Sequence, residues 1–263
     1  MCLNPKRYPT TYGRYVACGK CIECRLQRTR EWAYRIIDEA SLYPENDFLT
    51  LTYNASSLPD SGSLRPMDLQ KFLKRLRKAI SPRKVRFFAC GEYGRRGGRP
   101  HYHVVLFGYR FLDRYPWSKD NAGNVLYRSP TLERLWSFGY SVLGDVDEAS
   151  AFYVAKYMQK RVTGRKPPFL RMSNRPGIGY AYALKNTHLF ESDKDYFQGR
   201  SIPLPRYYIR ALSADGLTSA LDCKARRFDH FMTASSPDFG ALEERAKKFS
   251  RNLSISLDKV LHF

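Results

Sequence analysis

Two apolar segments that flank a short basic connection constrain the fold most. Residues 85–93 and 101–108 are rich in β-branched and aromatic side chains, as strands are, and residues 94–100 (GRRGGRP) join them. A connection of this length, rich in Gly, suits a β-hairpin. The centre of the chain is therefore predicted to contain two neighbouring antiparallel strands.

The segments around this hairpin alternate between helical and extended patterns. Apolar residues recur at helical spacing in residues 24–43, 69–80, 131–137 and 148–162, whereas residues 48–53 and 140–146 resemble buried strands. This order predicts an α+β protein with a largely antiparallel sheet. After residue 164 the signals weaken, and only residues 217–231 and 239–260 indicate helices.

The charge of the chain points to a polyanionic partner. Its 263 residues carry a formal net charge of +20, and residues 65–100 hold 12 Lys or Arg against two acidic residues, or +10. Nucleic acid is the leading candidate, although a cationic face can also be merely solvated. The candidate DNA contacts are the helical Lys71, Lys74, Arg75 and Lys78 and the loop residues Arg95, Arg96 and Arg99.

Composition excludes several other classes. A hydrophobic content of 43% supports a packed core and argues against disorder throughout. The longest apolar stretches are far shorter than the roughly 18 residues of a membrane-spanning helix. The first residues lack the apolar core of a secretory signal, so a reducing cytoplasm is expected.

His101 and His103 form the first candidate site. Side chains alternate along a strand, so both imidazoles are expected on one face, where they can bind one metal ion. Glu92, on the partner strand, can add a carboxylate to the same ion. The alternatives are ordinary structural histidines and a solvated glutamate at the end of a hairpin.

A group of tyrosines and lysines forms the second candidate site. Tyr153, Lys156, Tyr157 and Lys160 share one narrow face of the predicted helix 148–162. They could simply cover its wet side. A tyrosine hydroxyl has a pKa of about 10, so it needs a nearby lysine or metal ion to become a nucleophilic phenolate. Attack on a phosphodiester would give a phosphotyrosine, which keeps the energy of the broken bond and allows rejoining without ATP.

A third cluster is cysteine-rich. Cys18, Cys21 and Cys24 follow one another at two-residue intervals, and Cys2 is a conceivable fourth zinc ligand. Three cysteines at this spacing can equally be core thiols on a helix. Both interpretations remain open from the sequence.

Taken in order, these motifs resemble those of HUH endonucleases. The resemblance rests on residues 48–52 (FLTLT), 91–94 (GEYG) and 101–103 (HYH), and on Tyr153 with Lys156 and Tyr157. It is closer still to rolling-circle replication initiators of microviruses, especially the gokushovirus type. That likeness extends over residues 18–25 (CGKCIECR), 173–179 (SNRPGIG) and 205–208 (PRYY).

The resemblance implies a fold and a set of roles. It implies a ferredoxin-like palm, with a central antiparallel sheet of about five strands flanked by helices. His101, His103 and Glu92 would bind Mg²⁺ or Mn²⁺, Tyr153 and Tyr157 would be paired nucleophiles, and Lys156 would assist at the phosphate. Residues 1–164 would form the catalytic domain, and residues 165–263 a basic, partly helical region that packs on it or binds DNA.

The expected substrate is single-stranded or melted origin DNA, nicked and joined in the cytoplasm of a bacterial host. The chain lacks a GxxxxGK[ST] phosphate-binding loop, so a host helicase and polymerase are the expected partners. Tyr93 and Tyr102 are candidate base-stacking residues. Two alternatives remain: a nucleic-acid binding protein of ferredoxin-like fold without enzymatic activity, and a plasmid initiator or transposase that uses a single tyrosine.

Overall fold

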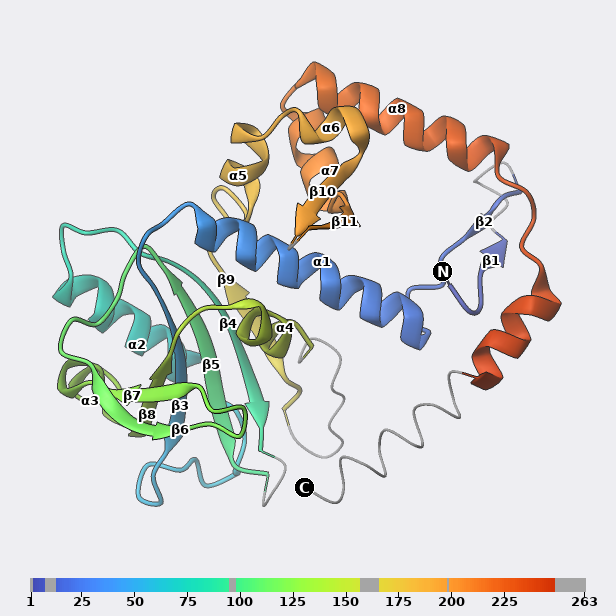
Figure 1. Cartoon of the computed structure of the whole chain (residues 1–263). Helices are drawn as coiled ribbons and strands as arrows, with labels where there is room; N and C mark the ends of the chain where they lie inside the picture. The colour runs from blue at the N-terminus through green and yellow to red at the C-terminus, as the bar shows by residue number, and fades with distance from the viewer. Residues whose placement is uncertain (1, 8–12, 95–97, 157–165, 198, 249–263) are drawn as a thin grey trace.

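A sheet of seven antiparallel strands forms the centre of the molecule (Figure 1). The computed structural model describes residues 2–7, 13–94, 98–156, 166–197 and 199–248. The sheet order is β6-β7-β8-β3-β5-β4-β9. Its strands are β3 (Asn46–Tyr53), β4 (Arg86–Tyr93), β5 (Pro100–Phe107), β6 (Tyr115–Lys119), β7 (Val125–Arg128), β8 (Gly139–Gly144) and β9 (Phe169–Met172). The predicted α+β class and hairpin are confirmed.

The core of the sheet follows a ferredoxin-like order. Along the chain come β3, α2 (Pro66–Ala79), β4, β5, α3 (Pro130–Leu135) and β8, which is a βαββαβ arrangement. The expectation of about five strands was too low. The β6–β7 hairpin, inserted between β5 and α3, extends the sheet at one edge, and β9 adds to β4 at the other. All five residues of β6 are exposed, so it lacks the alternation that would identify it in the sequence.

Strand alternation gives the sheet two different faces. Leu49, Leu51 and Tyr102 point towards α2 and α3 and form the larger apolar core. Phe88 and Val105 point the other way and pack with α1 (Ile22–Ser41) and α4 (Glu148–Lys156). The histidines share the parity of Val105 on β5, so they lie on the face that α1 and α4 partly cover.

Local signals fix where α4 begins. The Asp147 carboxylate accepts a hydrogen bond of 2.7 Å from the backbone N–H of Ser150, as expected of an N-cap residue. The Ser150 hydroxyl accepts in return from the backbone N–H of Asp147 at 2.8 Å. This reciprocal cap sets the start of the helix that carries Tyr153 and Lys156.

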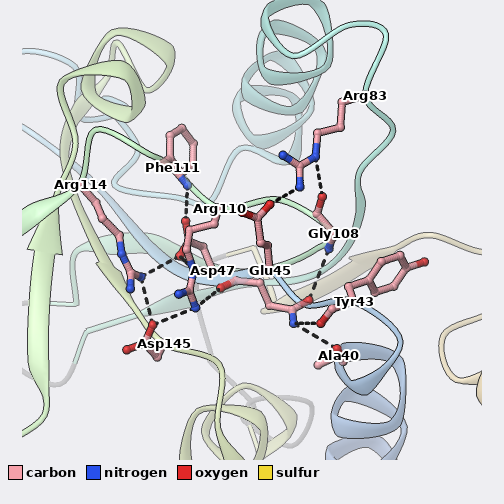
Figure 2. Close-up of polar contacts among 11 residues, drawn as sticks. Ala40, Tyr43, Glu45, Asp47, Arg83, Gly108, Arg110, Phe111, Arg114 and Asp145 are labelled. Carbon is pink, nitrogen blue, oxygen red and sulfur yellow. Dashed lines mark hydrogen bonds and ion pairs between the residues drawn. The ribbon is translucent and has the colours of Figure 1, made fainter.

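Ion pairs fix the end of β3 that lies away from the histidines (Figure 2). The buried Asp47 carboxylate accepts from the backbone N–H of Phe111 at 2.7 Å and from Arg114 at 3.1 Å. Arg114 and Arg110 also pair with Asp145, at 3.0 and 3.2 Å. Asp145 lies just before α4, so the network joins β3, the segment after β5 and the approach to α4.

Beyond the sheet, the C-terminal part of the chain forms a group of short elements beside α1 (Figure 1). They are α5 (Tyr180–Lys185), α6 (Leu189–Ser192), β10 (Lys194–Phe197), β11 (Arg200–Pro203), α7 (Arg206–Ala214) and α8 (Thr218–Thr233). The predicted helix 217–231 corresponds to α8. Residues 239–248 are also helical, and the rest of the predicted helix 239–260 lies outside the described residues. Near the N-terminus, β1 (Lys6–Arg7) pairs with β2 (Tyr15–Val16).

Helix α1 joins the sheet to the C-terminal elements. Its buried Ala33 and Ile36 pack on the sheet, whereas three buried polar residues contact the C-terminal part. Arg35 donates to the carbonyl of Ile178 at 3.0 Å. The predicted boundary at residue 164 lies outside the described residues and stays a prediction, but β9, which follows it, pairs with β4.

Candidate active site

Strand register brings two histidines and a glutamate together. On the β4–β5 hairpin, Glu92 pairs with His101, and Cys90 pairs with His103. Glu92 Oε1 lies 2.9 Å from Nε2 of His101 and 2.9 Å from Nε2 of His103. The predicted association of these three residues is therefore present in the structure. Glu92 and His103 are buried, and the His101 side chain is 14% exposed, so the cluster is open on one side.

The second nitrogen of each imidazole is anchored from behind. His103 Nδ1 lies 3.1 Å from the hydroxyl of Thr50, its pairing partner on β3. His101 Nδ1 lies 3.1 Å from the carbonyl oxygen of Arg99, which can only accept a hydrogen bond. Nδ1 of His101 therefore carries a proton, and the lone pair of its neutral ring is on Nε2. Such partners orient imidazoles towards a metal ion.

The cluster suits a divalent cation. Burial alone would raise the pKa of Glu92, but hydrogen bonds from His101 and His103 lower it to about 2. The carboxylate is therefore ionised at neutral pH. One oxygen of Glu92 and one nitrogen from each histidine lie within 4.8 Å of one another, as ligands of a single ion must. Three protein ligands on one side leave coordination positions for water or substrate.

Helix α4 brings a tyrosine against this cluster. The rings of Tyr153 and His103 meet edge to face, with centroids 4.9 Å apart. Phe48 stacks against the same histidine, with its ring centroid 5.6 Å from that of His103. Lys156 Nζ lies 5.0 Å from the centroid of the Tyr153 ring. Tyr153 and Lys156 thus lie where the sequence predicted them, whereas Tyr157 and Lys160 lie outside the described residues.

The candidate DNA contacts separate into two groups. Helix α2, which carries Lys71, Lys74, Arg75 and Lys78, covers the sheet face opposite the histidines. Arg75 also donates to the carbonyl of Leu135 at 2.8 Å, which joins α2 to α3. Arg99, in contrast, is exposed beside His101 and donates to the carbonyl of Tyr53 at 3.0 Å. Arg95 and Arg96 lie outside the described residues.

The two candidate stacking residues are wrong. Tyr93 and Tyr102 are buried in the core under α2, because their positions alternate with those of Glu92 and His101. An exposed tyrosine that sequence analysis missed lies elsewhere. Tyr140 on β8 is 60% exposed and pairs with Thr52, which in turn pairs with His101. Only the strand order reveals that Tyr140 lies on the histidine face.

Thr50 and Phe48 were also missed as functional residues. Both lie in the segment 48–52, but nothing in the sequence specifies the register that sets Thr50 opposite His103. The cysteine cluster, in contrast, is present: the sulfur atoms of Cys2, Cys18, Cys21 and Cys24 lie within 4.8 Å of one another.

Comparison with known proteins identifies the class. A family model for the replication-associated protein ORF2 family matches residues 46–162, which contain the cluster and Tyr153. Replication-associated protein VP4 of Bdellovibrio phage phiMH2K is 32% identical over 73% of this chain, and replication-associated protein ORF2 of Spiroplasma virus 4 is 30% identical over 76%. Replication-associated protein ORF4 of Chlamydia phage 1 is 36% identical over 55%.

These similarities define a family of phage replication proteins. The chain belongs to the replication-associated proteins of microviruses. It spans 65% of the Bdellovibrio phage protein, 38% of the Chlamydia phage protein and 68% of the Spiroplasma virus protein. No solved structure matches the chain. Across the residues that the structure describes, no helix combines the length and apolarity needed to cross a bilayer.

Proposed function

We propose that the protein nicks and rejoins single-stranded DNA at a phage origin, as an HUH endonuclease that forms a 5′-phosphotyrosine. The observation that carries this proposal is the contact of Tyr153 with a histidine whose Nε2 atom faces Glu92. A nucleophile of the right chemistry therefore lies beside a candidate metal site in a protein of a replication family. A passive DNA-binding protein would need neither group.

The proposed reaction exchanges one phosphate ester for another. The phenolate oxygen of Tyr153 attacks the phosphorus, a Tyr–O–P bond forms, and the bond from phosphorus to the 3′ oxygen breaks. The tyrosine proton passes to solvent or a basic group, and the departing 3′ oxygen receives one. Lys156, whose ammonium group lies 5.0 Å from the ring centroid, favours the phenolate through its positive charge.

Glu92, His101 and His103 would hold Mg²⁺ or Mn²⁺. When bound, the ion would orient the scissile phosphate and withdraw the charge that develops on its oxygen atoms. Imidazole ligands suit transition metals better than Mg²⁺, and carboxylates suit both, so this set favours Mn²⁺. Thr50 and the Arg99 carbonyl keep the histidine rings oriented for that ligation.

Two tyrosines would suit rolling-circle replication. One of Tyr153 and Tyr157 would hold the 5′ phosphate of the nicked strand, and the other would cut the regenerated origin after a full turn. The freed 3′ hydroxyl would then attack the first phosphotyrosine and release a circular strand. Lys160, one helical turn beyond Lys156 in the sequence, would assist in the same way as Lys156.

A covalent adduct is the decisive test. The purified chain is incubated with Mn²⁺ and single-stranded oligonucleotides that tile the genome encoding it. Denaturing electrophoresis and mass spectrometry then locate any adduct. We expect an adduct on Tyr153 or Tyr157 that disappears with a chelator and in the Tyr153→Phe/Tyr157→Phe variant. Tyr196→Phe, in the distant β10, is the matched control and should leave the yield unchanged.

The same experiment separates the alternatives. Binding of the oligonucleotides without an adduct, unaffected by His101→Ala, would contradict the nickase and favour a passive binding protein. Single Tyr→Phe variants address the second alternative. If only one tyrosine is ever modified and the other can be replaced without effect, the protein acts as a single-tyrosine initiator or transposase.

The remaining proposals concern context. We propose that residues 1–164 form the catalytic domain and that residues 165–263 support it or bind DNA. Because the chain lacks a phosphate-binding loop for ATP, a host helicase and polymerase would act at the nick in the bacterial cytoplasm. Strand separation by the purified protein with ATP would contradict this division of labour.

A further inference from the structure

Four cysteines from separate parts of the chain meet near the N-terminus. Cys2 precedes β1, Cys18 and Cys21 lie between β2 and α1, and Cys24 lies in the first turn of α1. The sulfur atoms of Cys2 and Cys21 are 3.8 Å apart, and those of Cys18 and Cys24 are 4.0 Å apart. Each of the four sulfurs lies within 4.8 Å of the others.

This spacing matches a tetrahedral thiolate site. Zinc binds cysteine sulfur at about 2.3 Å, which sets the sulfurs of a regular tetrahedron about 3.8 Å apart. A disulfide would require a separation of about 2.05 Å, and all six cysteines are free thiols. The observed separations are those of four ligands around one ion rather than of two oxidised pairs.

The backbone around the cysteines is arranged to support thiolates. The N–H groups of Lys20 and Cys21 donate to Cys18 Sγ at 3.4 and 3.2 Å, and the N–H of Cys18 donates to Cys2 Sγ at 3.2 Å. Gly19 adopts a φ of 70°, which allows the turn between Cys18 and Cys21. Hydrogen bonds of this kind stabilise sulfur in its charged form.

The burial of the cysteines excludes ordinary core packing for this cluster. Cys90 and Cys223 are buried within apolar clusters, as core thiols are. The four clustered cysteines are all half-buried, and only Cys24 lies within the helix, so they are not a stripe on one helical face. The alternative that the sequence left open is therefore wrong.

We infer that Cys2, Cys18, Cys21 and Cys24 bind one structural zinc ion that fastens the N-terminal hairpin to α1. Four protein ligands close the coordination sphere, so the ion has no open position for a substrate. The site shares no residue with the Glu92 cluster. Its role is to hold a segment that could not hold itself, since β1 and β2 have only two residues each.

The fastened segment also reaches the C-terminal part of the chain. Arg14 donates to the carbonyl of Ala234 at 3.0 Å and to that of Met232, at the end of α8. The ring of Tyr15 meets that of Phe239 with centroids 5.3 Å apart. The zinc site therefore joins the first helix of the sheet region to the last described helices through the β1–β2 hairpin.

Metal analysis of the full chain tests the inference. We expect about one zinc ion per wild-type chain by elemental mass spectrometry. Cys24→Ala should lower zinc content by more than about tenfold, since even groups that only support metal ligands contribute tenfold or more to affinity. Cys223→Ala is the control for loss of a thiol, and His101→Ala/His103→Ala separates this site from the Glu92 cluster. Both should retain zinc.

Further measurements on the wild-type protein avoid dependence on variant folding. Replacement of zinc by Co²⁺ should give the intense visible and near-ultraviolet bands of tetrahedral cobalt thiolate. Removal of zinc under reducing conditions should accelerate tryptic cleavage after Arg14 and Lys20, and added zinc should restore protection. Iron in place of zinc, zinc retained in Cys24→Ala, zinc lost from the histidine variant, or cleavage unchanged after zinc removal would each overturn the inference.

Discussion

Glu92 links the two halves of the candidate site at the scale of single residues. It is 1% exposed, and one of its oxygens faces both histidines at 2.9 Å. A buried carboxylate is stable only when it is paired or coordinates a metal ion. Its charge, rather than its shape, is therefore the property that the site requires.

Replacement of that charge gives the first prediction. Glu92→Gln keeps the size of the side chain but supplies a neutral ligand. We expect Mn²⁺ affinity, measured by calorimetry, and adduct yield to fall together by about a hundredfold or more. Glu191→Gln, in α6, is the control and should change neither. A variant that binds Mn²⁺ as tightly as the wild type would show that Glu92 is not a ligand.

Thr50 gives a subtler prediction at the same scale. Thr50→Val removes the hydroxyl that lies 3.1 Å from His103 Nδ1 but keeps the β-branched shape that suits β3. The imidazole loses its anchor, so Mn²⁺ affinity should fall by about ten- to a hundredfold. Thr50→Ser retains a hydroxyl and should restore most of the affinity. Equal affinities in Val and Ser variants would exclude a positioning role.

Which residues the sequence could predict depends on the kind of information required. Glu92, His101 and His103 were predictable because alternation along one hairpin fixes their common face. Thr50 and Tyr140 were not, because their relation to the histidines depends on the pairing of strands that are distant in sequence. Cys2 was named as a ligand without any local signal, and only the folded chain brings it to the other three.

At the scale of elements, local patterns identified what is regular and half-buried. Helices α1, α2 and α4 and strands β3, β4, β5 and β8 follow the predicted segments because each has one apolar face. The hairpin β6–β7 and strand β9 lack that signature. Edge strands owe their position to pairing with a sheet that the sequence alone does not show, so the strand count was underestimated.

The open side of β8 gives a prediction about DNA binding. The row from Glu92 through His101 and Thr52 to Tyr140 crosses four adjacent strands on one face. A base can stack on the exposed ring of Tyr140 while its strand passes the metal cluster. We expect Tyr140→Ala to weaken oligothymidine binding by about 1–3 kcal/mol, or roughly five- to a hundredfold in Kd.

A matched tyrosine makes the measurement specific. Tyr196 on β10 is 64% exposed, similar to Tyr140, but lies in a separate two-stranded sheet. Tyr196→Ala should therefore leave Kd unchanged in fluorescence anisotropy titrations at fixed salt. Equal effects of the two substitutions would mean that the chain uses any exposed aromatic ring, and that the β8 face has no special role.

At the scale of the whole molecule, α1 joins two regions through buried polar groups. Arg35 lies between the rings of Trp32 and Tyr207, with its guanidinium carbon 3.9 and 3.8 Å from the ring centroids. Asp38 accepts a hydrogen bond of 2.5 Å from the Tyr208 hydroxyl, on α7. Buried polar groups of this kind fix one relative arrangement of the elements they join, because each group left unpaired would be costly.

The C-terminal motifs of the sequence have their physical explanation here. Gly177 and Gly179 approach the rings of Tyr207 and Tyr208 so closely that a Cβ atom at either glycine would collide with the tyrosine hydroxyl. Glu39 of α1 accepts from the backbone N–H of Gly179 at 2.7 Å. The segments 173–179 and 205–208 therefore act together as a docking surface for α1.

Asp38 makes the stability of this junction depend on pH. Burial raises its pKa from 3.8 to about 8, since the Tyr208 hydrogen bond and the Arg35 charge only partly compensate for lost hydration. Between these values the folded chain retains a proton that the unfolded chain has released. Rising pH therefore favours unfolding across this window, by up to about 1.4 kcal/mol per pH unit.

The Asn variant isolates that contribution. Asp38→Asn is neutral at every pH, so its free energy of unfolding should fall less than that of the wild type between about pH 5 and pH 8. Chemical denaturation at several pH values measures the difference. Asp222→Asn, an exposed position on α8, should follow the wild-type curve. If the Asp38 variant and the wild type give parallel curves, Asp38 is ionised in the folded protein, and Arg35 rather than a bound proton neutralises it.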